Sequence, residues 1–213
     1  GKAPYKNVLV NDLVVDKDGQ KMSKSKGNTL DPFELFDKYG ADAVRFYSLY
    51  VSPAWMQTKF DEQGLIEVKN NFFRTYENVY NFFSLYANTD NLEVEDLVNI
   101  GDVNLEKIDK WLYSRLNSLV KDYYEQMEIF EYNKVVHMIS DFVVEDLSNW
   151  YIRRNRKRFW TSELTESKKA VYKTTYDALI TIAKLIAPIT PFIAEEVYRN
   201  LTGAKTVHTE LLQ

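Results

Sequence analysis

The sequence predicts a mainly α fold, in which a short α+β segment precedes a bundle of helices. Three observations lead to this prediction. Beyond about residue 61, apolar residues recur at spacings of three and four, the period of an amphipathic helix. Only 7 Gly and 5 Pro occur among 213 residues, which leaves long stretches free to be helical. Runs typical of strands lie within the first 60 residues.

The composition is that of an ordinary soluble protein, with 45% hydrophobic and 27% charged residues. A net charge of −4 excludes RNA binding by bulk positive charge, so any RNA contact needs a local basic patch. The absence of Cys excludes thiolate metal sites, and His137 and His208 leave zinc few ligands, so no metal site is expected. No window resembles a signal peptide or membrane span, so we expect a cytoplasmic protein with no membrane partner.

Short strands are expected at residues 7–10, 13–15 and 58–60, where residues that favour strands cluster. Asp18-Gly19 follows the second of these runs and is a strong signal for a tight turn. The N-terminal part of the chain is therefore expected to be a small mixed unit.

Helix start and stop signals follow in order. Asp31 at the N-cap and Pro32 at the first helical position predict the start of a short helix, which ends at Gly40. A second helix begins at residue 41 and stops before Ser52-Pro53. Longer helices are expected over residues 61–87, 105–123, 132–150, 172–186 and 191–202, the last between Thr190-Pro191 and Gly203. Four or five antiparallel helices with short connections predict a bundle.

The candidate catalytic segment is a polar loop over residues 21–28, whose only apolar side chain is Met22, so we expect it to be mobile. It begins with Lys21, Met22, Ser23, Lys24 and Ser25. Ammonium groups and hydroxyls donate to phosphate oxygens, and Lys charges can stabilise negative charge that grows in a transition state. A solvated surface loop is the alternative, but this string would arise by chance in about one chain of this length in ten thousand.

The pentapeptide resembles the KMSKS motif of class I aminoacyl-tRNA synthetases at all five positions. Residues 38–45, 146–160 and 187–196 resemble further blocks of the isoleucyl, valyl and leucyl branch, most closely the isoleucyl members. The resemblance therefore covers essentially the whole chain. Lys26 departs from the Leu that is common in bacterial members.

The resemblance implies three parts: the end of a Rossmann-type catalytic domain with the KMSKS loop at 1–30, a stem-contact-like connector at 31–62, and a helical anticodon-binding domain at 63–213. The parent enzyme would be a monomeric isoleucine–tRNA ligase that uses ATP and Mg²⁺ to join isoleucine to tRNA(Ile). Gly1 in place of Met and the missing HIGH-type motif indicate a piece of that enzyme. The piece alone is expected to be inactive and to hold no cofactor.

The same resemblance implies roles for the loop residues. Lys24 would be the principal catalytic contact to the ATP phosphates, and Lys21 would assist it. Ser23 and Ser25 would position the backbone or donate to phosphate, so residues 21–25 together form the expected ATP-binding segment.

A second candidate site is the basic run that ends the helix after residue 150. The expected tRNA contacts are Arg153, Arg154, Arg156, Lys157, Arg158 and Trp160. Arg clusters suit phosphate backbones, and aromatic rings stack on bases. A structural role stays open, because cations favour helix C-termini and 31 acidic residues are available as partners. Trp150 and Tyr151 continue the apolar stripe and are expected in the core, and His137 is expected in the core or at its boundary.

Three other functions are alternatives to that of an isoleucine–tRNA ligase. A valyl-tRNA synthetase segment is one, although Ser148-Asn149 and Arg153-Arg154 favour the isoleucyl type. A noncatalytic tRNA-binding module with a vestigial loop is another, although the intact pentapeptide argues against decay. A stand-alone ATPase is disfavoured because no Gly-rich Walker loop is present.

Overall fold

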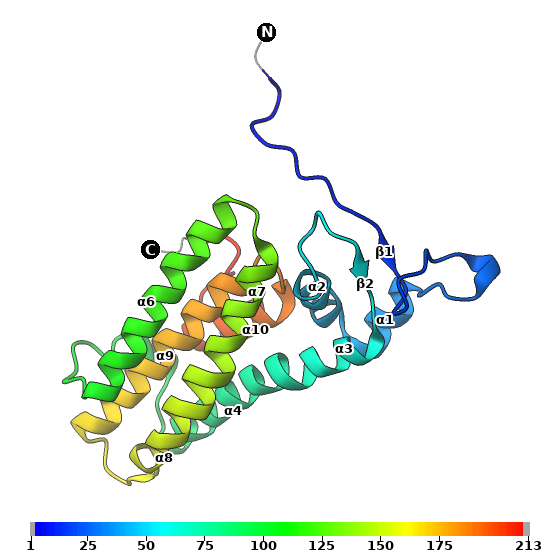
Figure 1. The fold of residues 1–213 in the computed structure, drawn as a ribbon. Helices are drawn as coiled ribbons and strands as arrows, with labels where there is room; N and C mark the ends of the chain where they lie inside the picture. The colour runs from blue at the N-terminus through cyan, green and yellow to red at the C-terminus, as the bar shows by residue number, and fades with distance from the viewer. Residues whose placement is uncertain (1–2, 211–213) are drawn as a thin grey trace.

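The computed structural model describes residues 3–210, and most of them are helical (Figure 1). A small N-terminal unit, residues 3–61, lies at one end of a long helix, and a bundle of helices packs around the other end (Figure 1). The prediction of a mainly α fold with an α+β beginning is confirmed. None of the helices in residues 3–210 is long and apolar enough to cross a membrane.

The N-terminal unit contains one small parallel sheet. Strand β1 (Val14–Val15) pairs with β2 (Thr58–Lys59), with Val14 opposite Thr58. The two strands confirm two of the three predicted runs. The predicted strand at residues 7–10 is wrong: this segment is exposed, and within residues 3–210 no strand pairs with it. A strand needs a hydrogen-bonding partner as well as suitable side chains.

Two short helices connect the strands, as predicted. Helix α1 (Pro32–Tyr39) starts where the Asp31 carboxylate accepts a hydrogen bond from the Phe33 N–H at 2.9 Å. Gly40, at φ +88°, separates it from helix α2 (Ala41–Tyr50). This φ lies in the region that side chains with a Cβ avoid, so glycine is needed at the corner.

The predicted long helix is one continuous run of three parts: α3 (Glu62–Val68), the wider π-helical η2 (Lys69–Phe73) and α4 (Arg74–Thr89). Asp61 caps it by accepting from the Gln63 N–H at 3.1 Å. Gly64 allows α3 to approach α2 closely, because a Cβ there would lie 2.5 Å from the Tyr47 hydroxyl oxygen.

The bundle is completed by α5 (Val94–Val98), α6 (Lys107–Glu128), α7 (Tyr132–Asp141), η3 (Phe142–Ile152), α8 (Arg153–Trp160), α9 (Glu166–Ile186) and α10 (Pro191–Thr202). Segments α7, η3 and α8 form one helical run, and α9 packs against α4, α6, α8 and α10. The fully buried side chains at the centre include Tyr76, Phe83, Leu112, Ile139, Leu147, Leu179 and Ile182. The periodicity predictions for these helices are thus confirmed.

One core prediction is wrong. Tyr151 is fully buried as predicted, but Trp150 is 45% exposed. Both lie in η3, where the π-helical hydrogen bonds span five residues instead of four. Each wider turn takes in more residues, so a stripe extrapolated at α-helical spacing drifts off the core face before it reaches Trp150.

The N-terminal unit is joined to the bundle by side chains that cap helix ends. Arg45 donates to the Ile189 carbonyl at 2.8 Å, where α9 gives way to α10. Asn133 of α7 donates to the Tyr50 carbonyl at 2.7 Å, and His137 contacts the same oxygen at 2.9 Å. The His137 ring also stacks on the Tyr50 ring, with centroids 3.8 Å apart, which confirms His137 as a boundary residue. These contacts satisfy carbonyls that helix termini leave unpaired.

Candidate functional site

The polar loop begins at a turn organised by Asp16. Its carboxylate accepts hydrogen bonds from the Asp18 N–H at 3.0 Å and the Gln20 N–H at 2.7 Å. Gly19 takes φ +80°, and Val15 forms an antiparallel bridge with Lys21. The turn predicted from Asp18-Gly19 is confirmed.

The loop itself contains one short 3₁₀ turn, η1 (Lys24–Lys26), which the sequence did not indicate. Gly27, at φ +65°, closes the turn by donating its N–H to the Lys24 carbonyl at 3.2 Å. Lys21, Lys24 and Ser25 are exposed, whereas Met22 is half-buried and packs against the edge of the core. Met22 therefore anchors the loop while both ammonium groups lie at the surface.

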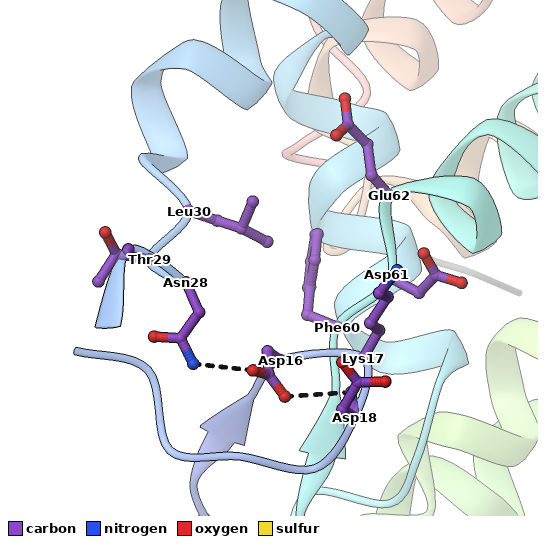
Figure 2. A pocket seen from close by; sticks show the side chains of 10 residues that line it. Asp16, Lys17, Asp18, Asn28, Thr29, Leu30, Phe60, Asp61 and Glu62 are labelled. Carbon is purple, nitrogen blue, oxygen red and sulfur yellow. Dashed lines mark hydrogen bonds between the residues drawn. The ribbon is translucent and has the colours of Figure 1, made fainter. Parts of the chain in front are cut away.

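Asn28 closes the base of the loop. Its side-chain oxygen accepts from the Ser23 N–H at 2.9 Å, and its amide nitrogen donates to Asp16 at 2.8 Å and to the Lys21 carbonyl at 3.3 Å. Figure 2 shows Asn28 directed at Asp16 across the loop base. The hydrogen bond from Asn28, followed by that from the Gln20 N–H, lowers the pKa of the Asp16 carboxyl. We refer to the Asp16–Asn28 pair as the loop latch.

The latch borders a hollow of about 390 Å³ between the loop base and the start of α3 (Figure 2). Acidic side chains from both sides line it, among them Asp18, Asp61 and Glu62. Carboxylates repel phosphate, so this hollow does not fit the phosphate chain of a nucleotide. The donors that fit phosphate oxygens are those of residues 21–25, on the projecting part of the loop.

Replacing Asn28 with Ala should free the loop base. The Ser23 N–H loses its acceptor, and its hydrogen exchange should become about 10-fold faster, in keeping with the loss of one or two half-buried hydrogen bonds. Acidification should likewise lower the protection of the Ser23 N–H relative to its intrinsic exchange rate, because a carboxyl with a lowered pKa stabilises the folded form until the pH falls through that pKa. Hydrogen–deuterium exchange read by NMR tests this, with the exposed Thr29→Ala as control. Equal Ser23 exchange rates in both variants would contradict the latch.

The basic run lies on α8, on the outside of the bundle. The residues exposed there are Arg153, Arg154, Arg156, Lys157 and Trp160. Arg158 differs from them, because only 12% of its side chain is accessible. The structure therefore divides the predicted tRNA contacts into an exposed group and one half-buried arginine.

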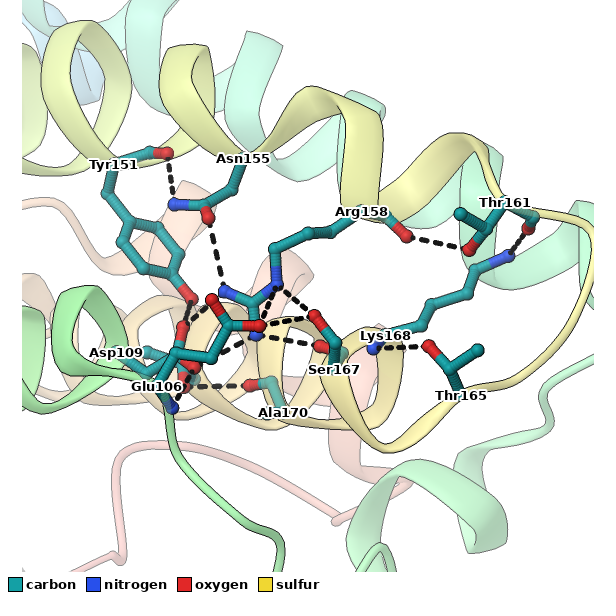
Figure 3. A network of polar contacts seen from close by, with 11 residues as sticks. Glu106, Asp109, Tyr151, Asn155, Arg158, Thr161, Thr165, Ser167, Lys168 and Ala170 are labelled. Atoms are coloured by element: carbon teal, nitrogen blue, oxygen red, sulfur yellow. Dashed lines mark hydrogen bonds and ion pairs between the residues drawn. The ribbon is translucent and has the colours of Figure 1, made fainter.

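Arg158 is held in an internal polar network (Figure 3). Its guanidinium donates through Nη1 and Nη2 to the two carboxylate oxygens of Asp109, at 2.7 and 2.9 Å. It also donates to the Ser167 hydroxyl at 2.9 Å, the Ser167 carbonyl at 2.7 Å and the Asn155 side-chain oxygen at 3.1 Å. A guanidinium has five N–H donors, and these contacts occupy them. Arg158 thus takes the structural role that the sequence left open.

Asp109 explains why Arg158 is held so firmly. It is fully buried near the start of α6, where it also accepts from the Tyr151 hydroxyl at 2.6 Å. Burial, and then the charge of Asp109, raise the pKa of Tyr151 far above its ordinary value, so Tyr151 remains a donor. Burial alone would lower the pKa of Arg158, but the hydrogen bonds and charge of Asp109 raise it overall.

A second buried ion pair lies beside the first. Lys168 is 1% exposed, and its ammonium nitrogen is 2.6 Å from Asp90. It also donates to the Thr161 carbonyl at 2.5 Å (Figure 3). Both ion pairs join residues far apart in the sequence, so they could not be predicted from helical periodicity.

Two aromatic residues that were not predicted as site residues lie beside the basic run. The Trp150 ring, on η3, is 6.1 Å from the half-buried Trp111 ring, on α6, centroid to centroid. The guanidinium carbon of Arg154 lies 3.6 Å from the Trp150 ring centroid, a cation–π contact. We call Trp111, Trp150 and Arg154 the surface stack.

Two family models match the chain. Residues 1–61 match the model described as tRNA synthetases class I (I, L, M and V). Residues 109–213 match the model described as anticodon-binding domain of tRNA ligase, and all three residues of the surface stack lie within this match. The polar loop falls in the first match and the basic run in the second.

Curated relatives match nearly the whole chain. An isoleucine–tRNA ligase from Porphyromonas gingivalis is 45% identical over 212 residues, 99% of this chain and 19% of that protein. Isoleucine–tRNA ligase from Cytophaga hutchinsonii is 47% identical over 200 residues, 94% of this chain and 18% of that protein. The chain therefore spans about a fifth of the length of the curated relatives that it matches.

Two solved structures share the fold. The ternary complex of Agrobacterium radiobacter K84 agnB2 LeuRS with tRNA and LeuAMS superposes with a TM-score of 0.65 at 22% identity, covering 92% of this chain and 23% of that one. Mycobacterium tuberculosis methionyl-tRNA synthetase with methionyl-adenylate gives a TM-score of 0.67 at 17% identity, covering 87% of this chain and 36% of that one. At these identities the likeness concerns the fold alone.

Proposed function

Because this chain belongs to the class I aminoacyl-tRNA synthetases and matches isoleucine–tRNA ligases over nearly its whole length, we propose that it is the loop-bearing and RNA-binding part of such a ligase. The ligase would activate isoleucine with ATP and transfer it to tRNA(Ile), as a cytoplasmic monomer. The observation that carries this proposal is the identity of 45% to isoleucine–tRNA ligases over 212 residues, with the pentapeptide at residues 21–25 intact.

The chemistry of the loop supports a role at the ATP phosphates. Lys21 and Lys24 are exposed cations on a loop that Met22 and the Asn28 hydrogen bonds anchor, so their long side chains can follow a phosphate as the loop closes. Ser23 and Ser25 lie together, with hydroxyl oxygens 3.2 Å apart, and both can donate to phosphate. In the activation step Lys24 would stabilise the charge that develops on the α-phosphate as pyrophosphate leaves. Mg²⁺ would arrive bound to the phosphates.

We divide the chain into three parts with different proposed roles. We assign residues 1–30 to the end of the catalytic domain, residues 31–62 to the connector and residues 63–213 to the anticodon-binding domain. The capping of α3 at Asp61 supports the second boundary, and the class I match ends at the same residue.

For tRNA we propose contacts from the exposed group alone. This group is Arg153, Arg154, Arg156, Lys157 and Trp160. Its cations have the long reach that a phosphate backbone requires, and the donors of Arg158 are already occupied by Asp109 and Ser167.

Replacing Arg156 with Ala should weaken tRNA binding by the full-length ligase and reduce the slope of log affinity against log salt by about one. The reason is that one exposed cation, with no role in the core, is removed from the phosphate backbone. Binding titrations at several salt concentrations measure both quantities. The matched control is Lys121→Ala, on the exposed part of α6, which should leave the slope unchanged. Equal slopes for Arg156→Ala and wild type would remove Arg156 from the contact.

The proposed activity is tested by ATP–pyrophosphate exchange with the full-length protein. Exchange is expected to be roughly 10- to 200-fold more efficient with isoleucine than with valine, because the two substrates differ by one methylene. Faster exchange with valine would assign the chain to a valyl enzyme. If the protein binds tRNA but neither amino acid supports exchange, the protein would be a noncatalytic tRNA-binding module and not a ligase.

A further inference from the structure

The surface stack is built from two helices and lies outside the core. Trp150 is 45% exposed although it is the kind of side chain that proteins bury, and Trp111 beside it is half-buried. Arg154 covers one face of the Trp150 ring at 3.6 Å, a distance at which the two planar groups are in contact. The Trp111 and Trp150 rings are tilted by 53°, with centroids 6.1 Å apart, so the close face contact in the surface stack is that between Arg154 and Trp150.

Positive charge surrounds the surface stack. On the helix that carries Trp150, Arg153 and Lys157 follow three and seven residues later, on the same side, and both are exposed. Lys107 is exposed and precedes Trp111 by four residues on α6, which places both on one side of that helix. Asp146, four residues before Trp150, is paired with Arg115 at 2.8 Å. The patch is basic although the whole chain carries a net charge of −4.

We propose that the surface stack receives an unpaired base of the bound tRNA, with the base stacked on the Arg154 guanidinium that Trp150 supports. This inference rests on the proposed tRNA-binding function and adds a subsite to it. Unpaired bases stack on aromatic rings and on arginine planes, whereas paired bases in an RNA helix offer no free face. Arg153, Lys157 and Lys107 would contact the phosphates on either side of the stacked base.

The composition of the patch favours RNA over a protein partner. A protein interface is usually depleted of Lys and places its aromatic residues at the centre of an apolar patch. Here the aromatic rings are surrounded by Lys and Arg on both helices. The combination of a basic track and stacking groups is characteristic of proteins that bind single-stranded nucleic acid.

The test compares two RNA probes with the full-length ligase: the tRNA(Ile) anticodon stem-loop, and the same stem closed as a blunt duplex. Trp150→Ala should weaken stem-loop binding about 10-fold or more, leave duplex binding unchanged and leave the salt slope unchanged, because no charge is removed. Arg154→Lys keeps the charge but removes the plane, so it should produce the same selective loss. Arg199→Lys, at an exposed arginine on α10 outside the proposed tRNA contacts, is the matched control and should bind both probes like wild type.

Each outcome is informative. If wild type binds neither probe nor full tRNA, the proposed tRNA-binding function fails, and the inference fails with it. If wild type binds the stem-loop and both Trp150→Ala and Arg154→Lys match it, the surface stack is not a base subsite, while the proposed function stands. If Trp150→Ala lowers the melting temperature, Arg154→Lys decides, since Arg154 is exposed and its replacement leaves the core intact.

Discussion

Replacing Lys24 with Ala should slow isoleucine-dependent ATP–pyrophosphate exchange by the full-length ligase about 100- to 1,000-fold, the usual cost of removing one preorganised donor from a developing negative charge. Lys24 is exposed on η1 and contributes no side-chain contact to the core, so the fold should be unaffected. The contact is proposed to strengthen in the transition state. The decrease should therefore appear mainly in kcat, with a smaller change in the KM for isoleucine.

The matched control for Lys24→Ala is Lys26→Ala. Lys26 is an exposed lysine on the same 3₁₀ turn, but it lies outside the pentapeptide. Its replacement should change the exchange rate by no more than about threefold, the size of a weakly screened surface-charge effect. Equal losses in both variants would mean that only the overall charge of the loop matters. A Lys24→Ala enzyme as fast as wild type would remove Lys24 from the catalytic machinery.

Replacing Arg158 with Ala should destabilise this chain by about 3–5 kcal/mol, because the carboxylate of Asp109 would be left buried without its cation. For a chain of 213 residues this corresponds to a fall in Tm of roughly 10 °C. Thermal unfolding followed by circular dichroism measures it. The control is Arg156→Ala, two residues away and exposed, which should change the free energy of unfolding by less than about 0.5 kcal/mol.

A double replacement separates lost pairing from lost packing. Changing Asp109 to Leu and Arg158 to Met together removes both charges and keeps apolar volume in the same place. Such exchanges of buried ion pairs are often neutral or stabilising, so part of the lost stability should return, while the Tyr151 hydroxyl loses its acceptor. If Arg158→Ala melts like wild type and weakens tRNA binding instead, the assignments of Arg156 and Arg158 would have to be reversed.

The helix ends could be predicted from the sequence because their signals are local. Asp31 accepts from a backbone N–H two residues later, and Gly203 ends α10 at φ +67°, both as expected from neighbouring residues alone. The packed faces of α6 and α9 could also be predicted, because an α-helix repeats regularly.

The division of the basic run could not be predicted. Arg156 and Arg158 have the same chemistry and similar neighbours, and they differ only in that Asp109, 49 residues earlier, lies opposite Arg158 in the folded chain. The exposure of Trp150 was missed because η3 departs from the α-helical period on which the prediction relied. Asn28 was missed because its partners are defined by the shape of the loop, although an amide side chain after a glycine carries the needed donor and acceptor.

The hydrogen bonds between α2 and the bundle limit which residues can change among related sequences. They run from the side chains of Arg45 and Asn133 to main-chain carbonyls at Ile189 and Tyr50. Every amino acid supplies the same carbonyl, so the accepting positions can change without loss of the hydrogen bond. The donating positions have no such freedom. Among related sequences, substitutions should therefore be rare at Arg45 and Asn133 and more frequent at Ile189, where only apolar character is required.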